Sequence, residues 1–487
     1  MASQEPQLHF VLFPFMAQGH LIPMIDLAKV LVQHNVIVTV VTTPHNAARF
    51  ESIVHRYTEA GFQIRVAKVH FPSKESGLPQ ECENLDMLPT LGMGFRFFSA
   101  ANISWQPVEK LFEELTPAPS CIISDMGLPY TTHIAKRFNI PWICFAAVSC
   151  FFLLCLHTLQ TTNMMENKAA ESEYLVLPGF PEKIEITKAQ TEHLTDKRWK
   201  EVADEYGAAS VATYGKIVNS FEELESAYER EYKMSNDKVW CIGPLSLSNK
   251  DHLDKAERGN KASIDENHLK SWLDFQQPGT VIYASLGSLC NLTAPQLIEL
   301  GLALEASKRP FIWVIRGGSL TEAMEKWIKE EGFEERSNGR SLVIRGWAPQ
   351  LLILSHPAIG GFITHCGWNS TLEAICAGVP MVSWPLFGDQ FFNENLVVQI
   401  LKVGVKVGAK STISWGKEEE IGVVVKKEDI ERAIESVMDE SSESEERRIR
   451  VRELAEVAKR AVEKGGSSHS DLTLLIQDIR QKIKRDT

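Results

Sequence analysis

Two polar side chains near the start of the sequence, His20 and Asp125, have the types and the spacing for acid–base chemistry. His20 follows the apolar segment around Val11, and Asp125 directly follows the apolar segment Cys121–Ser124. If both segments are strands of one parallel sheet, the two side chains lie at the same rim and can form a hydrogen bond. An aspartate on one imidazole nitrogen leaves the other nitrogen to remove a proton from a hydroxyl group. A capping histidine and an unrelated aspartate are the alternative that this spacing leaves open.

A second set of polar and aromatic residues is concentrated between Trp347 and Gln390. It combines an aromatic ring, backbone donors at a predicted helix start, the carboxylate of Glu373 and the polar pair Asp389 and Gln390. A sugar nucleotide needs such a set: a flat surface for the base, a carboxylate for ribose hydroxyls, donors for a diphosphate and hydrogen-bonding groups for a sugar. A carboxylate so close to an anion is otherwise unfavourable, so pairing with ribose hydroxyls explains Glu373. Trp347 taken alone could equally be a core residue.

Two glycine turns precede predicted helices and could hold phosphate groups. The first is Leu286–Ser288, and the second is His365–Ser370, which offers a histidine and several helix-start donors. Glycine permits close backbone approach, and a helix N-terminus supplies free N–H groups and a positive dipole end. A plain turn remains the alternative for the first segment. The residues that this argument selects are Ser288, His365, Gly367, Asn369 and Ser370.

Two other kinds of site fit the sequence less well. Zinc could be held by His365 with Cys366, but adjacent residues cannot easily face one metal and no second ligand cluster is present, so we expect no metal. A serine hydrolase would need a GxSxG turn, and Gly287-Ser288 lacks the second glycine and belongs to the other half of the chain.

The elements that must position these residues alternate between strands and helices in both halves of the sequence. The pattern predicts doubly wound parallel sheets, an α/β fold of two Rossmann-like domains that face each other across a cleft. The tail is predicted to be helical. The predicted strands are the segment around Val11, Val36–Thr42, Cys121–Ser124, Trp142–Phe145, Val281–Ser285, Phe311–Ile315, Ser341–Arg345, Ile359–Thr364 and Pro380–Trp384. Residues 166–204 show no clear periodicity.

A polar stretch with few apolar residues, 245–266, separates the two halves and predicts an exposed linker. We therefore expect an acceptor-binding domain over residues 1–248, a linker over 249–268 and a nucleotide-binding domain over 269–465. The helix over 466–487 is expected to pack back on the first domain.

Composition bounds the possible partners. The 487 residues carry 51 basic and 63 acidic side chains, a formal charge of −12, which argues against a nucleic-acid partner. No apolar run is long enough for a membrane helix, and no signal peptide is evident. Nine cysteines without CxxC pairing fit a reducing compartment. We expect a cytoplasmic monomer.

The wording and spacing of Trp347–Gln390 resemble the signature box of plant family 1 UDP-dependent glycosyltransferases. Three further segments resemble the same family: Pro14–His20 matches its N-terminal histidine motif, while Leu8–Phe50 and Pro72–Pro79 look like the branch that acts on triterpenoids, flavonoids and hormones. The resemblance covers nearly the whole chain and implies the GT-B fold with an inverting mechanism.

The resemblance also implies roles for individual residues. His20 would be the catalytic base with Asp125 as its partner, and Trp347 would stack on uracil. Gly19 stands where some relatives have a hydroxyl residue, so only its backbone could reach the β-phosphate. The other implied donor contacts are Ala348 and Gln350 to uridine, His365, Asn369 and Ser370 to the diphosphate, and Trp368, Asp389 and Gln390 to the sugar.

Glutamine at the last box position, Gln390, accompanies glucose donors in this family, so UDP-glucose is the expected co-substrate, without a cofactor or a required metal. The acceptor would be a small lipophilic plant metabolite with a hydroxyl or carboxyl group, in a pocket for which Phe15, Met93, Phe145 and Phe151 are candidate walls. The alternatives are another UDP-sugar, such as galactose, glucuronic acid or xylose, and a relative that binds UDP-sugars without turnover. The presence of both His20 and Asp125 disfavours the last.

Overall fold

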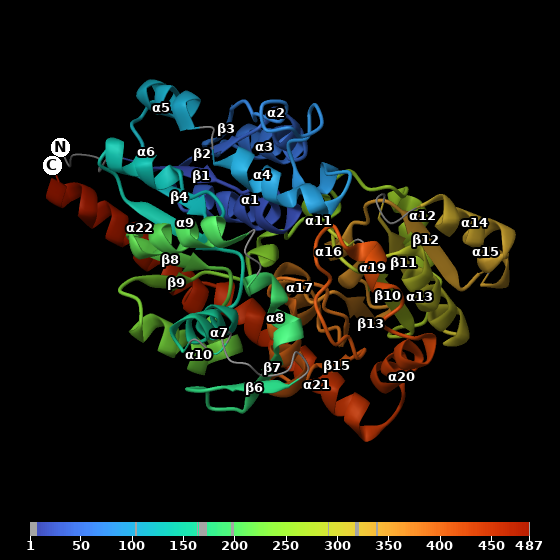
Figure 1. Cartoon of the computed structure of the whole chain (residues 1–487). Helices are drawn as coiled ribbons and strands as arrows, with labels where there is room; N and C mark the ends of the chain where they lie inside the picture. The colour runs from blue at the N-terminus through green and yellow to red at the C-terminus, as the bar shows by residue number, and fades with distance from the viewer. Residues whose placement is uncertain are drawn as a thin grey trace.

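The protein forms two α/β lobes, one around strands β1 to β9 and one around strands β10 to β15 (Figure 1). The computed structural model describes residues 7–102, 105–162, 164, 173–195, 199–290, 292–316, 321–337 and 339–486. Each lobe has a parallel sheet whose strand order reverses once, so the predicted doubly wound α/β architecture is confirmed.

The first sheet has seven strands in the order β3-β2-β1-β4-β5-β8-β9. Its central strands β1, β2, β4 and β5 are buried along their whole length, because helices cover both faces of a parallel sheet. The order reverses between β1 and β4, where ligands bind in sheets of this type. The strands are β1 (His9–Phe13), β2 (Ile37–Thr42), β3 (Ile64–Lys68), β4 (Cys121–Asp125), β5 (Trp142–Ala146), β8 (Gly215–Val218) and β9 (Val239–Cys241).

Helix α1 (Gln18–Gln33) follows β1 directly and packs its apolar face on the sheet. The last helix, α22 (Ser467–Asp486), runs along the same lobe and is red in Figure 1. Its Leu475 and Ile479 share a hydrophobic core with Phe10 of β1. The other helices of this lobe are α2 (Pro44–Ala48), α3 (Glu51–Glu59), α4 (Gly94–Ala101), α5 (Trp105–Glu114), α6 (Thr131–Arg137), α7 (Cys150–Thr161) and α10 (Glu222–Met234).

The second sheet has six strands in the order β12-β11-β10-β13-β14-β15, with the reversal between β10 and β13. Four of its strands have the predicted bounds, because continuous β-branched and aromatic runs mark buried parallel strands clearly. The strands are β10 (Val281–Ser285), β11 (Phe311–Ile315), β12 (Ser341–Arg345), β13 (Ile359–Thr364), β14 (Met381–Ser383) and β15 (Gly404–Lys406). The helices are α13 (Ala294–Ala306), α14 (Glu322–Glu330), α15 (Phe333–Arg336), α16 (Gln350–Leu354), α17 (Trp368–Ala377), α18 (Gln390–Asn395), α19 (Glu418–Ile421), α20 (Lys427–Met438) and α21 (Ser442–Val462).

The region without sequence periodicity contains a small hairpin and two helices. Strands β6 (Tyr174–Leu177) and β7 (Ile184–Thr187) pair antiparallel, and α8 (Lys188–Thr195) and α9 (Lys200–Val211) follow. The hairpin packs Leu177 and Ile184 into the core with α7 and α10. Parts of this region, 165–172 and 196–198, lie outside the described residues.

The segment between the two sheets, predicted to be an exposed linker, is folded and only partly exposed: residues 250–253 are exposed, whereas Asn249 and Asp254 are buried. It forms the 3₁₀ helix η5 (Leu245–Ser248), α11 (His252–Ala256) and the start of α12 (Glu266–Asp274). Asp254 and Lys29 form a buried ion pair with Nζ and Oδ2 2.8 Å apart. Asn249 is also buried and accepts a hydrogen bond from Lys29 at 2.6 Å. Polar composition suggested exposure, whereas partners distant in the sequence satisfy these groups inside the protein.

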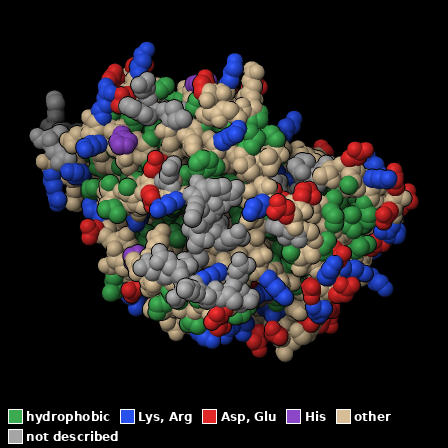
Figure 2. All heavy atoms as spheres, in the orientation of Figure 1, with side chains coloured by type: hydrophobic (Ala, Val, Ile, Leu, Met, Phe, Trp, Pro, Cys, Tyr) green, Lys and Arg blue, Asp and Glu red, His purple; other side chains and the backbone are tan. Residues whose placement is uncertain are grey.

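The surface carries both charge signs without a dominant basic region on the visible face. Blue and red side chains are interspersed over both lobes in Figure 2, which fits the formal charge of −12. Within the described ranges, no helix combines the length and the apolar character needed to cross a membrane.

Candidate active site

The first sheet brings His20 and Asp125 together at its reversal point. Strands β1 and β4 are neighbours, with Phe13 opposite Ser124, so the residues that follow them meet at one rim. His20 Nδ1 lies 2.8 Å from Asp125 Oδ2, and the carboxylate is completely buried. Its other oxygen, Oδ1, accepts a hydrogen bond from the backbone N–H of Gly127 at 2.8 Å. The geometry therefore brings together the two residues that sequence spacing left as a possible pair.

The surroundings of His20 favour a base that is easily protonated. Burial by itself lowers the pKa of His20. The negative charge of Asp125 and its hydrogen bond raise the pKa by more than burial lowers it, so the pKa lies above the ordinary 6.5. The side chain is 35% exposed, and Nε2 is the nitrogen that Asp125 does not occupy. The ring packs edge-on against Phe15, with centroids 5.5 Å apart.

The reversal point of the second sheet holds the two glycine turns. β10 and β13 are neighbours, with Ser285 opposite Thr364, so Gly287 and His365 meet beyond their ends. A Cβ atom on Gly287 would lie 2.5 Å from His365 Nε2, and one on Gly367 would lie 2.4 Å from it. Both glycines therefore make room for the imidazole, and Gly287 also has a φ of +84°. Ser288 continues the first turn and is partly buried.

His365 is a neutral hydrogen-bonding group in this pocket. Burial lowers its pKa to about 4, and the buried Nδ1 has no hydrogen-bond partner among the described residues. A buried polar atom without a partner is uncommon. The imidazole of His365 lies beside the start of α17, a position that suits an N–H donor to an anionic ligand.

Helix α17 contacts the first lobe through its first residues. The Asn369 side-chain amide donates to the carbonyl of Gly19 at 2.5 Å, and the Trp368 indole N–H donates to the carbonyl of Asn219 at 2.7 Å. Trp368 is 2% exposed and belongs to a hydrophobic core. Its indole thus packs in the core and anchors α17 to the first lobe, and the contact of Trp368 with the sugar stays a prediction.

Glu373, Gln350 and Ser370 form one hydrogen-bonded group near Trp347. Gln350 Nε2 donates to Ser370 Oγ at 2.9 Å and to Glu373 Oε2 at 2.8 Å. Glu373 also pairs with Arg258, a residue that sequence analysis did not select. Ala348 lies in the same loop and is buried.

Trp347 lies in the loop after β12 and is only partly buried, so it is not an ordinary core residue. The guanidinium of Arg316 lies 4.8 Å from the centre of its ring. The indole Nε1 is buried and has no hydrogen-bond partner among the described residues.

Asp389 and Gln390 open α18 on the side of His20. Burial raises the pKa of Asp389 to about 6, against the lowering effects of its hydrogen bond from Asn393 and of His20. Gln390 Oε1 accepts from the backbone N–H groups of Leu386 at 2.7 Å and Phe387 at 3.1 Å. The side-chain oxygen of Gln390 thus orders the loop before it, and its amide Nε2 is the group left for a ligand.

A chain of aromatic rings runs from Phe15 across both lobes. Phe15 stacks on Phe98 at 4.6 Å, and Phe98 meets Trp199 at 5.1 Å. Trp199 meets Trp415 at 5.6 Å, and Trp415 meets Phe387 at 5.5 Å. These rings start at Phe15, which packs against His20, and end at Phe387, two residues before Asp389, so they form an aromatic wall between these two polar residues.

Sequence reasoning missed four members of this wall because nothing in the sequence marks them as neighbours. Trp199 lies in the region without periodicity, and Trp415 comes from the other lobe. Met93 lies near the wall, in the same hydrophobic cluster as Phe15 and Trp415. Phe145 and Phe151 do not join it. Both are completely buried, Phe145 in the core beneath α1 and Phe151 against Phe180 and Tyr228, so the structure places them in the core and their contact with an acceptor stays a prediction.

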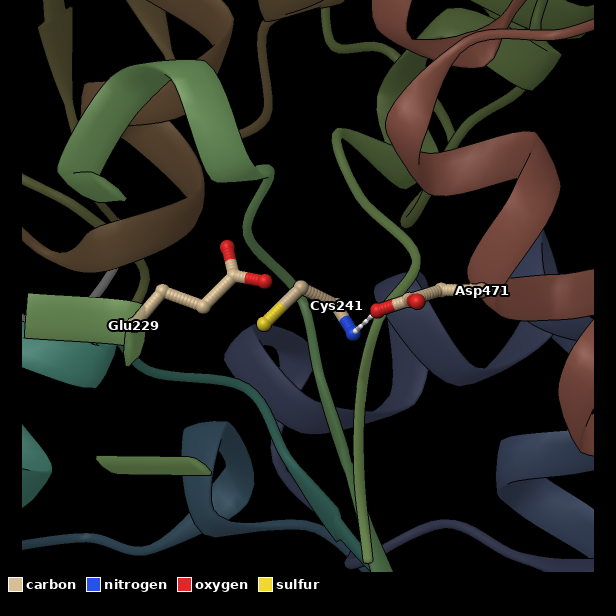
Figure 3. Close-up of side chains that lie close together, drawn as sticks. All are labelled: Glu229, Cys241 and Asp471. Atoms are coloured by element: carbon tan, nitrogen blue, oxygen red, sulfur yellow. Dashed lines mark hydrogen bonds between the residues drawn. The ribbon is translucent and has the colours of Figure 1, made fainter. Parts of the chain in front are cut away.

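The described residues contain one cluster with possible metal ligands, Glu229, Cys241 and Asp471 (Figure 3). Lys233 Nζ lies 2.7 Å from Glu229 Oε1 and 2.9 Å from Asp471 Oδ2. The lysine ammonium therefore pairs with both carboxylates, and the cluster is better explained as an internal ion-pair network. At His365, the neighbouring Cys366 thiol is fully buried and its pKa is raised well above the usual value by burial, which does not suit a metal ligand.

Comparisons with known proteins cover the whole chain. The family model described as "UDP-glucoronosyl and UDP-glucosyl transferase" matches residues 256–451, and "Glycosyltransferase, N-terminal domain" matches residues 7–247. UDP-glycosyltransferase 73C2 of Arabidopsis thaliana is 55% identical over 483 residues, 98% of this chain and 97% of that protein. UDP-glycosyltransferase 73C11 of Barbarea vulgaris is 52% identical over 97% of each chain.

Solved structures give the same picture. Glycyrrhiza uralensis UGT73P12, complexed with glycyrrhetinic acid 3-O-monoglucuronide, has a TM-score of 0.91 at 35% identity over 99% of this chain and 98% of its own. Phytolacca americana UGT2, complexed with UDP-2fluoro-glucose and pterostilbene, has a TM-score of 0.75 at 26% identity over 98% of this chain and 100% of its own.

Proposed function

The chain belongs to the plant family 1 UDP-glycosyltransferases, and from this membership we propose that it is an inverting O-glucosyltransferase that uses UDP-glucose. That it is a glycosyltransferase enzyme follows from the family. The donor sugar, the acceptor class and the stereochemical course are the proposal. The acceptor we propose is a hydroxyl group of a small lipophilic plant metabolite such as a triterpenoid, a flavonoid or another phenolic aglycone.

The observation that carries the proposal is the pair of His20 and Asp125 at 2.8 Å, at the base of an aromatic wall. Asp125 holds Nδ1, so Nε2 can accept the proton of an acceptor hydroxyl. The acceptor oxygen then forms a bond to the anomeric carbon while the bond from that carbon to the UDP oxygen breaks. One direct displacement of this kind converts an α-linked donor into a β-linked product.

The leaving diphosphate would be stabilised from the second lobe. The N-terminus of α17 offers free N–H groups and its positive dipole end, and Asn369 and Ser370 stand in its first turn. His365, neutral with a pKa of about 4, would donate a hydrogen bond rather than supply a charge. We propose that these groups make a metal ion unnecessary.

Two features support the choice of sugar and acceptor. Gln390 offers an amide donor and Asp389 a carboxyl beside it, a combination suited to neighbouring hydroxyls of glucose. The aromatic wall suits a flat or polycyclic acceptor. The related structures were solved with a glycyrrhetinic acid glucuronide and with pterostilbene, and we extend that kind of acceptor to this chain. Transfer of galactose, glucuronic acid or xylose remains the alternative.

The test is a screen of triterpenoid, flavonoid and simple phenolic aglycones with UDP-glucose, in which products are identified by mass spectrometry. NMR of the anomeric proton decides between inversion and retention. We expect a β-glucoside, and a roughly 10²- to 10⁴-fold loss of rate in His20→Ala with little change in UDP binding. An α-product, or near-normal turnover of His20→Ala, would overturn the mechanism. Size-exclusion chromatography and fluorescent tagging in plant cells test the proposed monomeric state and cytoplasmic location.

A further inference from the structure

Residues 258–263, here named the strap, join the two lobes at the residues assigned to the nucleoside. Arg258 Nε lies 2.9 Å from Asp26 Oδ2 on α1, and its Nη1 pairs with Glu373 on α17. The side chains of all three residues are at most 9% exposed. A guanidinium that bridges two buried carboxylates from different lobes is a defined structural link and not a surface ion pair.

The strap is also bound to Trp347, the proposed uracil contact. The backbone N–H of Ser263 donates to the carbonyl of Trp347 at 2.8 Å, and the N–H of Trp347 donates to Ser263 Oγ at 2.9 Å. Gly259 lies so close that a Cβ atom there would be 2.3 Å from Trp347 Cζ2, and its φ of +93° favours glycine. The strap therefore contacts both the aromatic ring and the carboxylate of the nucleoside site.

The hydrogen bonds of Glu373 leave room for a ligand. One carboxylate oxygen is paired with Arg258 and the other accepts from Gln350 at 2.8 Å. Because a carboxylate can accept about four hydrogen bonds, each oxygen retains capacity for one ribose hydroxyl. The planar guanidinium of Arg258 fixes the orientation of the Glu373 carboxylate.

We propose that Arg258 is a positioning residue for UDP: it holds the Glu373 carboxylate in the orientation in which both ribose hydroxyls can donate to it. This inference rests on the donor site assigned above. Since Arg258 also holds Asp26, on the helix that carries His20 in its first turn, it connects the nucleoside site to the helix of the base. The ligand group that depends on Arg258 is thus the pair of ribose hydroxyls, which Glu373 binds.

The test compares two nucleotides that differ by one hydroxyl, UDP and 2′-deoxy-UDP, by isothermal titration calorimetry. The wild-type protein should bind UDP about 10-fold more tightly, as expected for a hydroxyl donating to a charged acceptor. Arg258→Ala should raise the Kd of UDP about 10-fold and that of 2′-deoxy-UDP less than about 3-fold, so that the ratio between the two nucleotides nearly disappears. A general loss of protein stability would weaken the binding of both nucleotides equally and leave the ratio of their Kd values unchanged.

Arg56→Ala is the matched control. Arg56 anchors the same connecting segment through Asp254 and Glu257 but does not contact Glu373. This variant should keep the wild-type ratio. Arg258→Lys retains the positive charge but lacks the planar guanidinium that holds two carboxylates. The ratio of the two Kd values in this variant should therefore lie between those of Arg258→Ala and the wild type. It also serves if Arg258→Ala does not fold.

Three results would overturn the proposal: an unchanged ratio in folded Arg258→Ala and Arg258→Lys, tighter UDP binding in these variants, or a wild-type ratio near one. Tighter binding would mean that Arg258 competes with the ribose. These are equilibrium measurements on the two nucleotides without sugar or acceptor, so they are independent of whether the glucosyl transfer proposed above takes place. Failure of that function would show as missing product with wild-type nucleotide discrimination.

Discussion

Asn369 at the start of α17 donates a hydrogen bond to the carbonyl of Gly19 at the start of α1, with 2.5 Å between nitrogen and oxygen. The two helices come from different lobes, and each begins at the reversal point of its own sheet. One helix start carries His20, the proposed base, and the other carries the donors proposed for the diphosphate. This contact therefore links the helix start that carries the proposed base to the helix start proposed to hold the diphosphate.

The contact predicts a strong effect of substitution at Asn369. Asn369→Ala should weaken UDP binding about 10-fold, because a hydrogen-bond donor to the charged diphosphate is lost. Asn369→Asp has nearly the same shape but places a carboxylate next to a carbonyl oxygen and a diphosphate, so it should bind UDP still more weakly. Calorimetry with UDP checks both. Normal affinity in Asn369→Asp would show that this side chain faces away from the ligand.

The ion pair of His20 and Asp125 predicts the acid limb of the pH profile. His20 must be neutral to act as a base, and its pKa is raised above 6.5, so kcat/KM for the acceptor should rise with pH through a midpoint above 6.5. Asp125→Asn removes the charge that raises this pKa and should lower both the midpoint and the plateau rate. A profile whose midpoint does not move in Asp125→Asn would contradict the pairing.

Trp347 is predicted to stack on uracil. Trp347→Ala should weaken UDP with or without an attached sugar, since base–aromatic stacking contributes about 1–3 kcal/mol, or roughly 5- to 150-fold in Kd. Because the ring also contacts the strap, circular dichroism must first show that the variant is folded. Unchanged UDP binding by a folded variant would assign Trp347 a purely structural role.

Donor choice is predicted to depend on Gln390 and Asp389. UDP-galactose should react much more slowly than UDP-glucose in competition on one aglycone, because moving a hydroxyl leaves its buried partners unpaired. Gln390→His should narrow that gap, and Asp389→Ala should reduce transfer while sparing UDP binding.

Gln390→Glu is the informative companion variant. It keeps an oxygen to accept from Leu386 and Phe387 but lacks the amide donor, so it separates loop order from sugar contact. Full activity of Gln390→Glu, or equal use of both donors by the wild type, would refute the assignment.

Metal removal is predicted to have no effect. The helix N-terminus, Asn369, Ser370 and His365 are proposed to stabilise the departing UDP without a cation. Dialysis against EDTA should therefore leave kcat unchanged, and added Mg²⁺ or Mn²⁺ should not raise it more than about 2-fold, the level of ordinary assay variation. Loss of activity that only a divalent ion restores would show that the site needs a metal.

The sequence alone determined the family and the fold class, and it located the candidate donor residues at the strand ends, while their contacts with UDP-glucose stay predictions. Buried parallel strands are continuous apolar runs, so β10 to β13 could be located within the chain with their bounds. Polar residues just after such strands, including His20, Asp125 and His365, must gather at the strand ends, because in this topology those ends share one rim.

Tertiary structure decided how the polar groups are satisfied and which rings meet. A polar composition between the lobes indicated an exposed linker, yet the side chains of Asp254 and Arg258 are only 6% and 9% exposed. Their charges are matched by Lys29, Asp26 and Glu373 from elsewhere in the chain. Trp199 and Trp415 carry no local signal for a shared wall. Such long-range pairings depend on the packing of two lobes, which no local pattern of residues encodes.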